Sequence, residues 1–431
     1  MIFQTPIAVD IGFFQVHTST PKKKRVGRMS AAPALKPVPS RVPELDGFRA
    51  CAVLMVLVHH MFYGWKTPAL ARLPHMIRVP IEQGWHGVDL FFVLSGFLIT
   101  GILLDSKDSE HYFRNFYTRR VLRIVPLYAT CIILMYFGYP KSGKYFLLSM
   151  VYLANFAFCF RVGIPHGPGV FWSLAIEEHF YLVWPFAVRI FNRAWLLVII
   201  TTIVIGSPIL RGICAHAGMD PEQQIYPYSF FRLDALAMGG FLALWFRSRY
   251  YNRASAWTIA CALAGLTLLM MPLGRRYGIM NTKSAIATAL HYSQYAFVFA
   301  GFLALAVAHQ GSTFTALLRT RAARITADLS YCIYLIHLTV GDFYYRILSA
   351  LRIKDVSQLG VVGSISLRIA VVGSVTFGLA ALSKRFLEDP FLRLKRYFCP
   401  KGQDLELLLL QGGSARGLNM YRKRQPRRNI A

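Results

Sequence analysis

Two basic side chains in the first apolar stretch of the chain, Arg49 and His60, are spaced for chemistry on one helix face. Eleven helical steps return to within about 20° of the starting direction and rise about 16 Å, whereas His59 points roughly 80° away. Imidazole has the ordinary pKa nearest neutrality, so His60 can take a proton from a hydroxyl or accept an acyl group itself. A hydrogen-bonded packing histidine is the alternative, and only the neighbouring motifs decide against it.

A second cationic pair, Arg120 and Arg123, lies in the segment Phe-Tyr-Thr-Arg-Arg-Val-Leu-Arg. Residues three apart share one face of a helix. Guanidinium groups match phosphate oxygens, and coenzyme A (CoA) carries a diphosphate and a 3′-phosphate. Charge that only sets the membrane topology explains the pair equally well.

Adjacent carboxylates interrupt an aromatic segment, FWSLAIEEHFY, which contains Glu177 and Tyr181 four residues apart. These two side chains share a helix face, and two carboxylates beside a histidine are hard to explain as packing. Glu177 can orient an imidazole, accept a proton or pair with an arginine. Another histidine, His337, lies near the middle of a late apolar segment.

Other polar residues within the apolar segments are expected to support the site or the packing. Asp89 is expected to pair with a histidine or an arginine, and Ser95 with Gly96 to allow close helix packing. Arg232 and Asp234 are interpreted as a structural pair of opposite sign. The predicted supporting residues are Asp46, Asp89, Ser95, Tyr181, Arg232 and Asp234.

The composition indicates that a membrane positions these residues. The chain is 55% hydrophobic and 16% charged, whereas a soluble domain carries about 25% charged residues. Several apolar runs approach the roughly 20 residues that cross a bilayer. The predicted fold is all-α, a polytopic transmembrane bundle of about ten helices. The predicted spans are 48–65, 84–104, 121–140, 172–191, 195–213, 229–247, 255–273, 291–309, 327–348 and 362–386.

The net charge of +28 comes from Lys and Arg residues between and beyond the apolar runs. Such residues mark cytoplasmic loops and meet anionic lipid headgroups, so we expect no nucleic-acid partner. Both termini are predicted to be cytoplasmic if 145–160 does not cross, although Arg275, Arg276 and Lys283 then fall outside. The expected organisation is a basic, disordered segment 1–41, a transmembrane domain 42–398, and a basic, disordered tail 399–431.

The seven cysteines show neither CxxC nor CxH spacing, and most lie in apolar runs. Cysteine there behaves as a small hydrophobic residue. The sequence therefore predicts no metal site and no disulfide framework.

Six segments together resemble the acyltransferase-3 family of integral membrane O-acyltransferases. They occur in family order between about 42 and 390, and they read PELDGFRACAVLMVLVHH, GVDLFFVLSGFLITGIL, FYTRRVLRIVPLY, FWSLAIEEHFYLVWP, RLDALAMGG and LSYCIYLIHL. The resemblance implies ten spans in a bacterial inner membrane, with acyl-CoA bound from the cytoplasm and no permanently bound cofactor. It also implies a carbohydrate acceptor, such as a surface polysaccharide, a lipopolysaccharide or a glycolipid.

The resemblance also assigns roles to individual residues. The family's Arg-x10-His corresponds to Arg49 and His60, and its Arg-x-x-Arg to Arg120 and Arg123. Its Glu is Glu177, and its late His is His337. The expected catalytic residues are His60, Glu177 and His337, and the expected ligands of the CoA phosphates are Arg49, Arg120 and Arg123.

The expected reaction transfers an acyl group, most simply acetyl, from acyl-CoA to a carbohydrate hydroxyl. His60 would act as the base or as a transient acyl carrier. A proton-coupled transporter is the rival hypothesis, since intramembrane His, Glu and Arg also form proton relays. The absence of visible internal repeats and the cationic clustering at one mouth disfavour it. A scaffold with inert charged pairs is the third hypothesis.

Overall fold

The computed structural model describes residues 42–62, 74–277, 284–351 and 360–398, and every regular element in these ranges is a helix. The predictions for 1–41 and 399–431 lie outside the described residues. The first helices are α1 (Pro43–Phe62), α2 (His75–Glu82), α3 (Gly87–Asp105), α4 (Tyr112–Gly138), α5 (Gly143–Met150), α6 (Phe171–Ile190) and α7 (Arg193–His216). Then come α8 (Leu233–Phe246), α9 (Arg253–Tyr277), α10 (Ala285–Ala308), α11 (Arg321–Ala350), α12 (Gly360–Arg368), α13 (Ser374–Ser383), α14 (Asp389–Arg393) and α15 (Lys395–Phe398).

Seven helical stretches in the described ranges are long and apolar enough to cross a membrane. Three further predicted spans coincide with α6, α8 and α11; α8 has only 14 residues, and the other two carry several charged side chains. The all-helical, multi-pass fold is confirmed, and the number of ten spans stays a prediction.

The outer helices expose apolar side chains that only a lipid environment can cover. The most apolar window of α7 is 22% buried and that of α9 is 17% buried, whereas the window of α10 is 72% buried. Exposed large apolar residues are costly in water in proportion to their area. These helices therefore belong at the periphery of a bundle embedded in a bilayer.

The region between α4 and α6 contains no helix long enough to cross. α5 ends after eight residues, and turns and short 3₁₀ segments follow up to Val170. A crossing helix needs about 20 residues. This geometry agrees with the prediction that 145–160 does not span the membrane.

α4 begins nine residues earlier than predicted, at Tyr112 rather than at 121. Its first turns are not a loop, because their aromatic residues pack against α6. The Tyr112 hydroxyl donates to the Pro185 carbonyl at 3.0 Å, and the Tyr117 hydroxyl donates to Leu182 at 2.8 Å. Arg114, Arg119 and Arg120, which precede the predicted span 121–140, therefore lie in the helix.

Two glycines let α3 and α8 cross in contact. A methyl group added at Gly96 would overlap the Leu236 carbonyl, and one at Gly239 would overlap Val93. The predicted packing role of Gly96 is confirmed.

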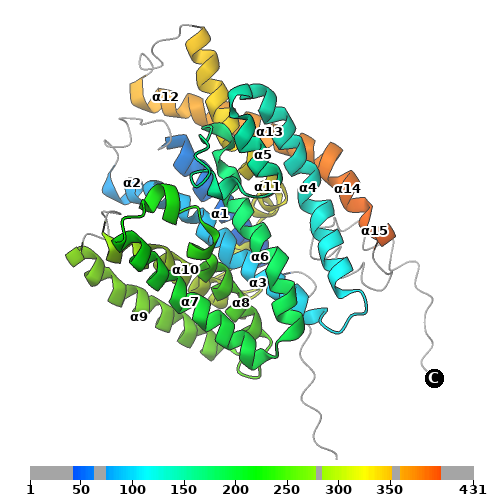
Figure 1. Ribbon diagram of the computed structural model, residues 1–431, viewed down its shortest axis with the longest axis vertical. Coiled ribbons are helices and arrows are strands. Elements are labelled where there is room, and N and C mark those ends of the chain that lie inside the picture. Colours follow the sequence, from blue (N-terminus) through cyan, green and yellow to red (C-terminus); the bar gives the residue numbers. More distant parts are fainter. Residues whose placement is uncertain (1–41, 63–73, 278–283, 352–359, 399–431) are drawn as a thin grey trace, which may run out of the picture. The chain divides into compact units, whose positions relative to one another are not determined.

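Around the α3–α8 pair, α7 packs on α8 and α10, and α10 packs on α9 (Figure 1). α1 packs between α3 and α11.

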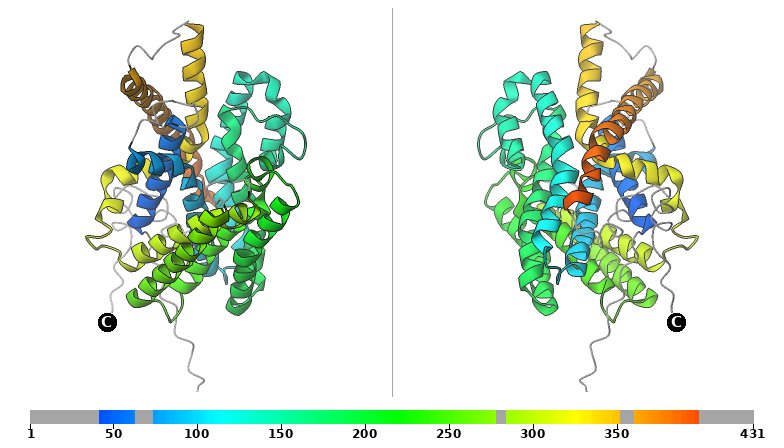
Figure 2. Two further views of the ribbon diagram at one scale, coloured as in Figure 1. Left: turned by 90° about the vertical axis from the view of Figure 1, so that its left-hand side faces the viewer. Right: turned by 90° about the vertical axis from the view of Figure 1, so that its right-hand side faces the viewer.

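The C-terminal helices run beside α4 and α11. α13 packs against α11, and both α14 and α15 contact α4 (Figure 1). The C-terminal turns of α11 project beyond the neighbouring helices in both views of Figure 2. Elements α1, α3, α4, α6 and α11 meet around one cavity, which holds half of the predicted site residues.

Candidate active site

A cavity between α1, α3, α4, α6 and α11, here called the arginine pocket, contains half of the predicted site residues. Its empty space is about 880 Å³, part of which opens to the surroundings. Its walls include Arg49, Ser95, Arg120, Arg123, Glu177 and Tyr181. The structure therefore brings together the predicted arginines and Glu177 from segments far apart in the sequence.

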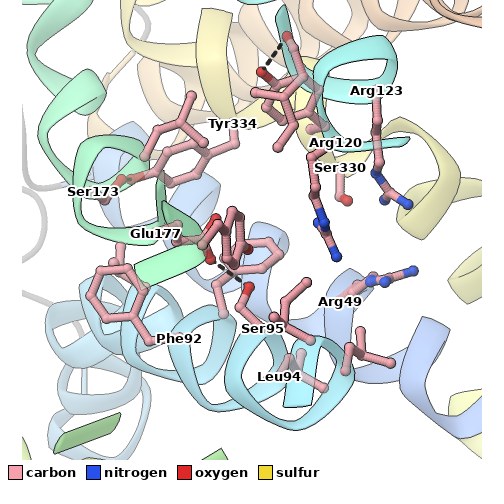
Figure 3. A pocket seen from close by; sticks show the side chains of 18 residues that line it. Arg49, Phe92, Leu94, Ser95, Arg120, Arg123, Ser173, Glu177, Ser330 and Tyr334 are labelled. Carbon is pink, nitrogen blue, oxygen red and sulfur yellow. Dashed lines mark hydrogen bonds between the residues drawn. The ribbon is translucent and has the colours of Figure 1, made fainter. Parts of the chain in front are cut away.

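Three arginines gather at one end of the arginine pocket (Figure 3). Arg49 lies 3.6 Å from Asp46, one turn before it on α1, so Asp46 orients this guanidinium. The Arg120 guanidinium lies over the Tyr181 ring, 4.7 Å from its centroid. Neither Arg120 nor Arg123 forms an ion pair or a hydrogen bond with a residue that the structure describes. Two guanidinium groups on one helix face thus remain available to an anion.

Glu177 occupies the middle of the arginine pocket. The Ser95 hydroxyl donates to the Glu177 carboxylate at 2.5 Å, a bond that joins α3 to α6 (Figure 3). The sequence interpreted Ser95 as a packing residue, and this interpretation is wrong: Gly96 makes the close contact with α8, and Ser95 faces the cavity. Adjacent helical residues point about 100° apart, so only one of the two can face α8.

The far end of the arginine pocket is aromatic, with Phe92, Ser173 and Tyr334 in its wall (Figure 3). The Tyr334 and Ser173 hydroxyls lie 2.5 Å apart. Tyr334 was not among the predicted site residues. Its position three residues before His337 was the available signal, because that spacing places both side chains on one face of a helix.

His60 and His337 do not line the arginine pocket. They meet in a second, smaller cavity lined also by Leu57, Met61 and Arg368. The His337 Nε2 atom lies 3.1 Å from the His60 Nδ1 atom. The ring of His337 is 5.8 Å from the ring of Tyr334, so Tyr334 stands between the two cavities.

The helix bounds explain why Arg49 and His60 separate despite sharing a helical stripe. α1 starts at Pro43, so Arg49 lies in its second turn and His60 in its last turn. The shared stripe runs along α1, but different neighbours cover its two ends. The helical period of the sequence predicts the direction of each side chain, but it does not predict which residues from other helices surround that side chain.

Hydrogen bonding assigns one protonation pattern to the neutral histidine pair. The His337 Nδ1 atom lies 2.8 Å from the Tyr334 carbonyl, so this nitrogen carries the proton and Nε2 accepts. The His60 Nδ1–H then donates to His337 and to the Val56 carbonyl at 2.9 Å. The His60 Nε2 atom keeps its lone pair and has no hydrogen-bond partner among the described residues.

A separate group of charged residues, here called the buried ion network, comprises His86, Asp89, Arg211, Arg232, Asp234 and Ser293. Asp89 accepts from Arg232 at 2.5 Å and pairs with the His86 Nδ1 atom at 2.8 Å. The predicted pairing of Asp89 with a histidine or an arginine is confirmed twice.

Arg232 and Asp234 do not pair with each other, so the predicted pairing is wrong. Asp234 accepts from Arg211 at 2.9 Å and from Ser293 at 2.6 Å, whereas Arg232 reaches Asp89. Residues two apart at the start of a helix point in different directions. The network ties α3, α7, α8 and α10 together, which favours a structural role.

Comparison with known proteins assigns the family. Residues 42–383 match the family model of the acyltransferase-3 domain, described as an acyltransferase domain. The peptidoglycan O-acetyltransferase OatA of Listeria monocytogenes is 28% identical over 382 residues, which cover 81% of this chain and 55% of that protein. The O-acetyltransferase OatA of Staphylococcus aureus is 26% identical over 404 residues, covering 84% of this chain and 60% of that protein.

A putative peptidoglycan O-acetyltransferase of Bacillus subtilis, YrhL, is 28% identical over 399 residues, or 81% of this chain and 54% of that protein. The chain thus spans somewhat more than half the length of these relatives. No solved structure matches it significantly. The resemblance in the six sequence segments is confirmed over most of the chain, and this protein belongs to the acyltransferase-3 family.

Proposed function

We propose that this protein is an O-acetyltransferase that moves an acetyl group from acetyl-CoA to a hydroxyl of a bacterial cell-envelope glycan. The observation that carries the proposal is the arginine pocket, where Arg49, Arg120 and Arg123 converge on one end of a cavity that also holds Glu177. Guanidinium groups suit a polyphosphate, and those of Arg120 and Arg123 form no ion pair with a carboxylate of the described residues. The names of the relatives support a peptidoglycan-type acceptor, and the multi-pass fold suits the bacterial inner membrane.

In this proposal the donor lies along the arginine pocket. Its phosphates bind at the arginine end, and its thioester arm passes Ser95 and Glu177 toward Tyr334. Glu177 is held by Ser95, so its carboxylate is oriented toward the cavity rather than free to pair with the arginines. The thioester therefore reaches the wall that separates the two cavities.

His60 is the proposed base, through its Nε2 atom. It takes the proton of the acceptor hydroxyl as the hydroxyl oxygen attacks the thioester carbonyl carbon. The carbon–sulfur bond then breaks, and the departing CoA thiolate takes the proton from the imidazolium. His337 is a positioning residue, because both of its nitrogens are engaged and it fixes the tautomer of His60.

Tyr334 must move for this reaction, since the reacting atoms have to approach to about 3–3.5 Å. Its hydroxyl is bonded to Ser173, and its ring separates His337 from the arginine pocket. Rotation of this one side chain would join the two cavities. We therefore propose that Tyr334 controls the access of the thioester to His60.

Membranes containing the protein, supplied with radiolabelled acetyl-CoA and isolated peptidoglycan, test the proposal. Wild-type membranes should place label in the glycan, and His60→Ala should lower the rate by about 10²–10⁴-fold. His309→Ala is the matched control, because the Nδ1 atom of His309 also lies 2.9 Å from the carbonyl four residues earlier. Full glycan labelling in His60→Ala membranes would show that His60 is not the base of the reaction.

The same assay separates the enzyme from a proton-coupled transporter. A transporter would leave the glycan unlabelled and acidify or alkalinise vesicles on substrate addition. The enzyme should produce free CoA in step with glycan label, and no pH change inside the vesicles.

A further inference from the structure

The C-terminal helix α15 carries a lysine that none of the steps above uses. Lys395 is only 5% exposed, and its ammonium nitrogen has no hydrogen-bond partner. α15 packs against α4, the helix that carries Arg120 and Arg123 (Figure 1). A buried ammonium group without a partner is costly, so lysine is rarely found in this state.

The charged side chains around Lys395 repel its ammonium group instead of neutralising it. The charged side chains that act on it are, in order of strength, Arg123, Arg120, Lys384 and Arg119, and all of them are cationic.

Two carboxylates lie in the same C-terminal segment, but neither pairs with Lys395. Asp389 forms a salt bridge with Lys384, with 3.1 Å between the carboxylate oxygen and the ammonium nitrogen. Glu388 forms no ion pair within the described residues, and the basic side chains that act on it most strongly are Lys384 and Arg123. The cationic cluster therefore has unmatched positive charge beside the arginine pocket.

We propose that Lys395 binds a phosphate group of the CoA donor together with Arg120 and Arg123, as a fourth cationic ligand beside Arg49. This inference rests on the proposed function, because it requires CoA in the arginine pocket. The unpartnered ammonium on α15 and the two guanidiniums on α4, the helix that α15 packs against, would supply the donors to one phosphate. An anionic lipid phosphate has the same chemistry, and the experiment below separates the two sources.

Burial, and then the charges of Arg123 and Arg120, lower the pKa of Lys395 to about 6. Without an anion the side chain is therefore mostly neutral above that pH. A bound phosphate favours the ammonium form, so binding takes up a proton. Donor affinity should be full below about pH 6 and fall as the pH rises, until it passes the higher pKa of the phosphate-bound lysine.

Equilibrium binding of CoA and of 3′-dephospho-CoA to the full-length protein in zwitterionic nanodiscs tests this inference without any acceptor. Lys395→Met should raise the Kd for CoA about tenfold, as expected for one charge-assisted hydrogen bond. Weakening of CoA alone assigns the contact to the 3′-phosphate, and equal weakening of both ligands assigns it to the diphosphate. Lys107→Met is the control, because this half-buried lysine already donates to the Phe191 carbonyl.

Lys395→Arg provides a second measurement that does not remove the charge. Arginine stays protonated, so this variant should bind CoA more tightly than the wild type at about pH 8.5 and with little pH dependence.

The two possible failures can be told apart. Wild-type protein without saturable CoA binding would refute the proposed donor. Normal binding with an unchanged Kd in Lys395→Met would overturn the role of Lys395 alone, as would an effect seen only when anionic lipid is added.

Discussion

Arg211 and Arg232 in the buried ion network each bond to a carboxylate, whereas Arg120 and Arg123 in the arginine pocket bond to none among the described residues. The paired arginines are 0% and 1% exposed, and they link helices. Those of the pocket are half-buried and line a cavity. We therefore assign the paired, fully buried arginines of the network to a structural role, and we propose the unpaired Arg120 and Arg123 of the pocket for ligand binding.

Asp89→Ala should give the largest effect on the network side. The change leaves Arg232 and His86 without their partner, and breaking a buried pair costs about 3–5 kcal/mol. Thermal unfolding in detergent should show a large loss of stability. Glu82→Ala, which removes a half-exposed carboxylate 3.5 Å from Arg78, should change stability by less than about 1 kcal/mol.

The double variant Asp89→Ala/Arg232→Met sharpens this test. Removing both charges should recover part of the lost stability, since no uncompensated guanidinium remains. A double variant less stable than Asp89→Ala alone would mean that Arg232 stabilises the protein mainly through the contacts of its guanidinium with the rings of Tyr226 and Tyr292.

Arg123→Met should weaken donor binding without lowering the stability of the protein, which is the opposite of the effect expected in the network. The affinity for acetyl-CoA should fall by about 1.5–3 kcal/mol, the contribution of a hydrogen bond to a charged group. Stability should stay constant or rise, because a like charge beside Arg120 is removed. Arg189→Met, a change at an exposed arginine that donates to the Lys107 carbonyl, should leave donor affinity unaltered. A strongly destabilised Arg123→Met protein would show that Arg123, like the arginines of the network, has a structural role.

Ser95→Ala should give the smallest effect. It removes the hydrogen bond to Glu177 but leaves that carboxylate open to the pocket. We therefore expect the activation free energy of acetyl transfer to rise by about 1 kcal/mol. Ser330→Ala is the matched control, because this serine also lines the pocket but donates to the Ala327 carbonyl at 2.8 Å. Equal effects of both changes would show that the bond to Glu177 has no special role.

The sequence predicted the helical, multi-pass fold and the three arginines and Glu177 of the arginine pocket, because both follow from local periodicity and short motifs. Spacings of three and four residues placed Arg120 with Arg123, and Glu177 with Tyr181, on shared faces. The partners of Arg232 and Asp234 could not be predicted in this way. Each depends on a residue from another helix, and only the folded bundle decides which helices meet.

The separation of His60 from Arg49 was also beyond sequence reasoning. Helical geometry gives the direction of a side chain, but the wall that Tyr334 forms comes from α11, nearly 300 positions along the chain from α1. The early start of α4 had a similar cause, since the packing of Tyr112 and Tyr117 on α6 overrides the polar character of its first turns.

The partition at Tyr334 has a consequence for the cell that houses this protein. A water-filled passage continuous from one side of a bilayer to the other would conduct protons and dissipate the membrane potential. In the proposed reaction, the Tyr334 ring, hydrogen-bonded to Ser173, would separate the two cavities between turnovers and so limit such a leak. In the proposed reaction, the same ring would keep a bound thioester away from the imidazole until the acceptor arrives, and so would protect the donor from hydrolysis.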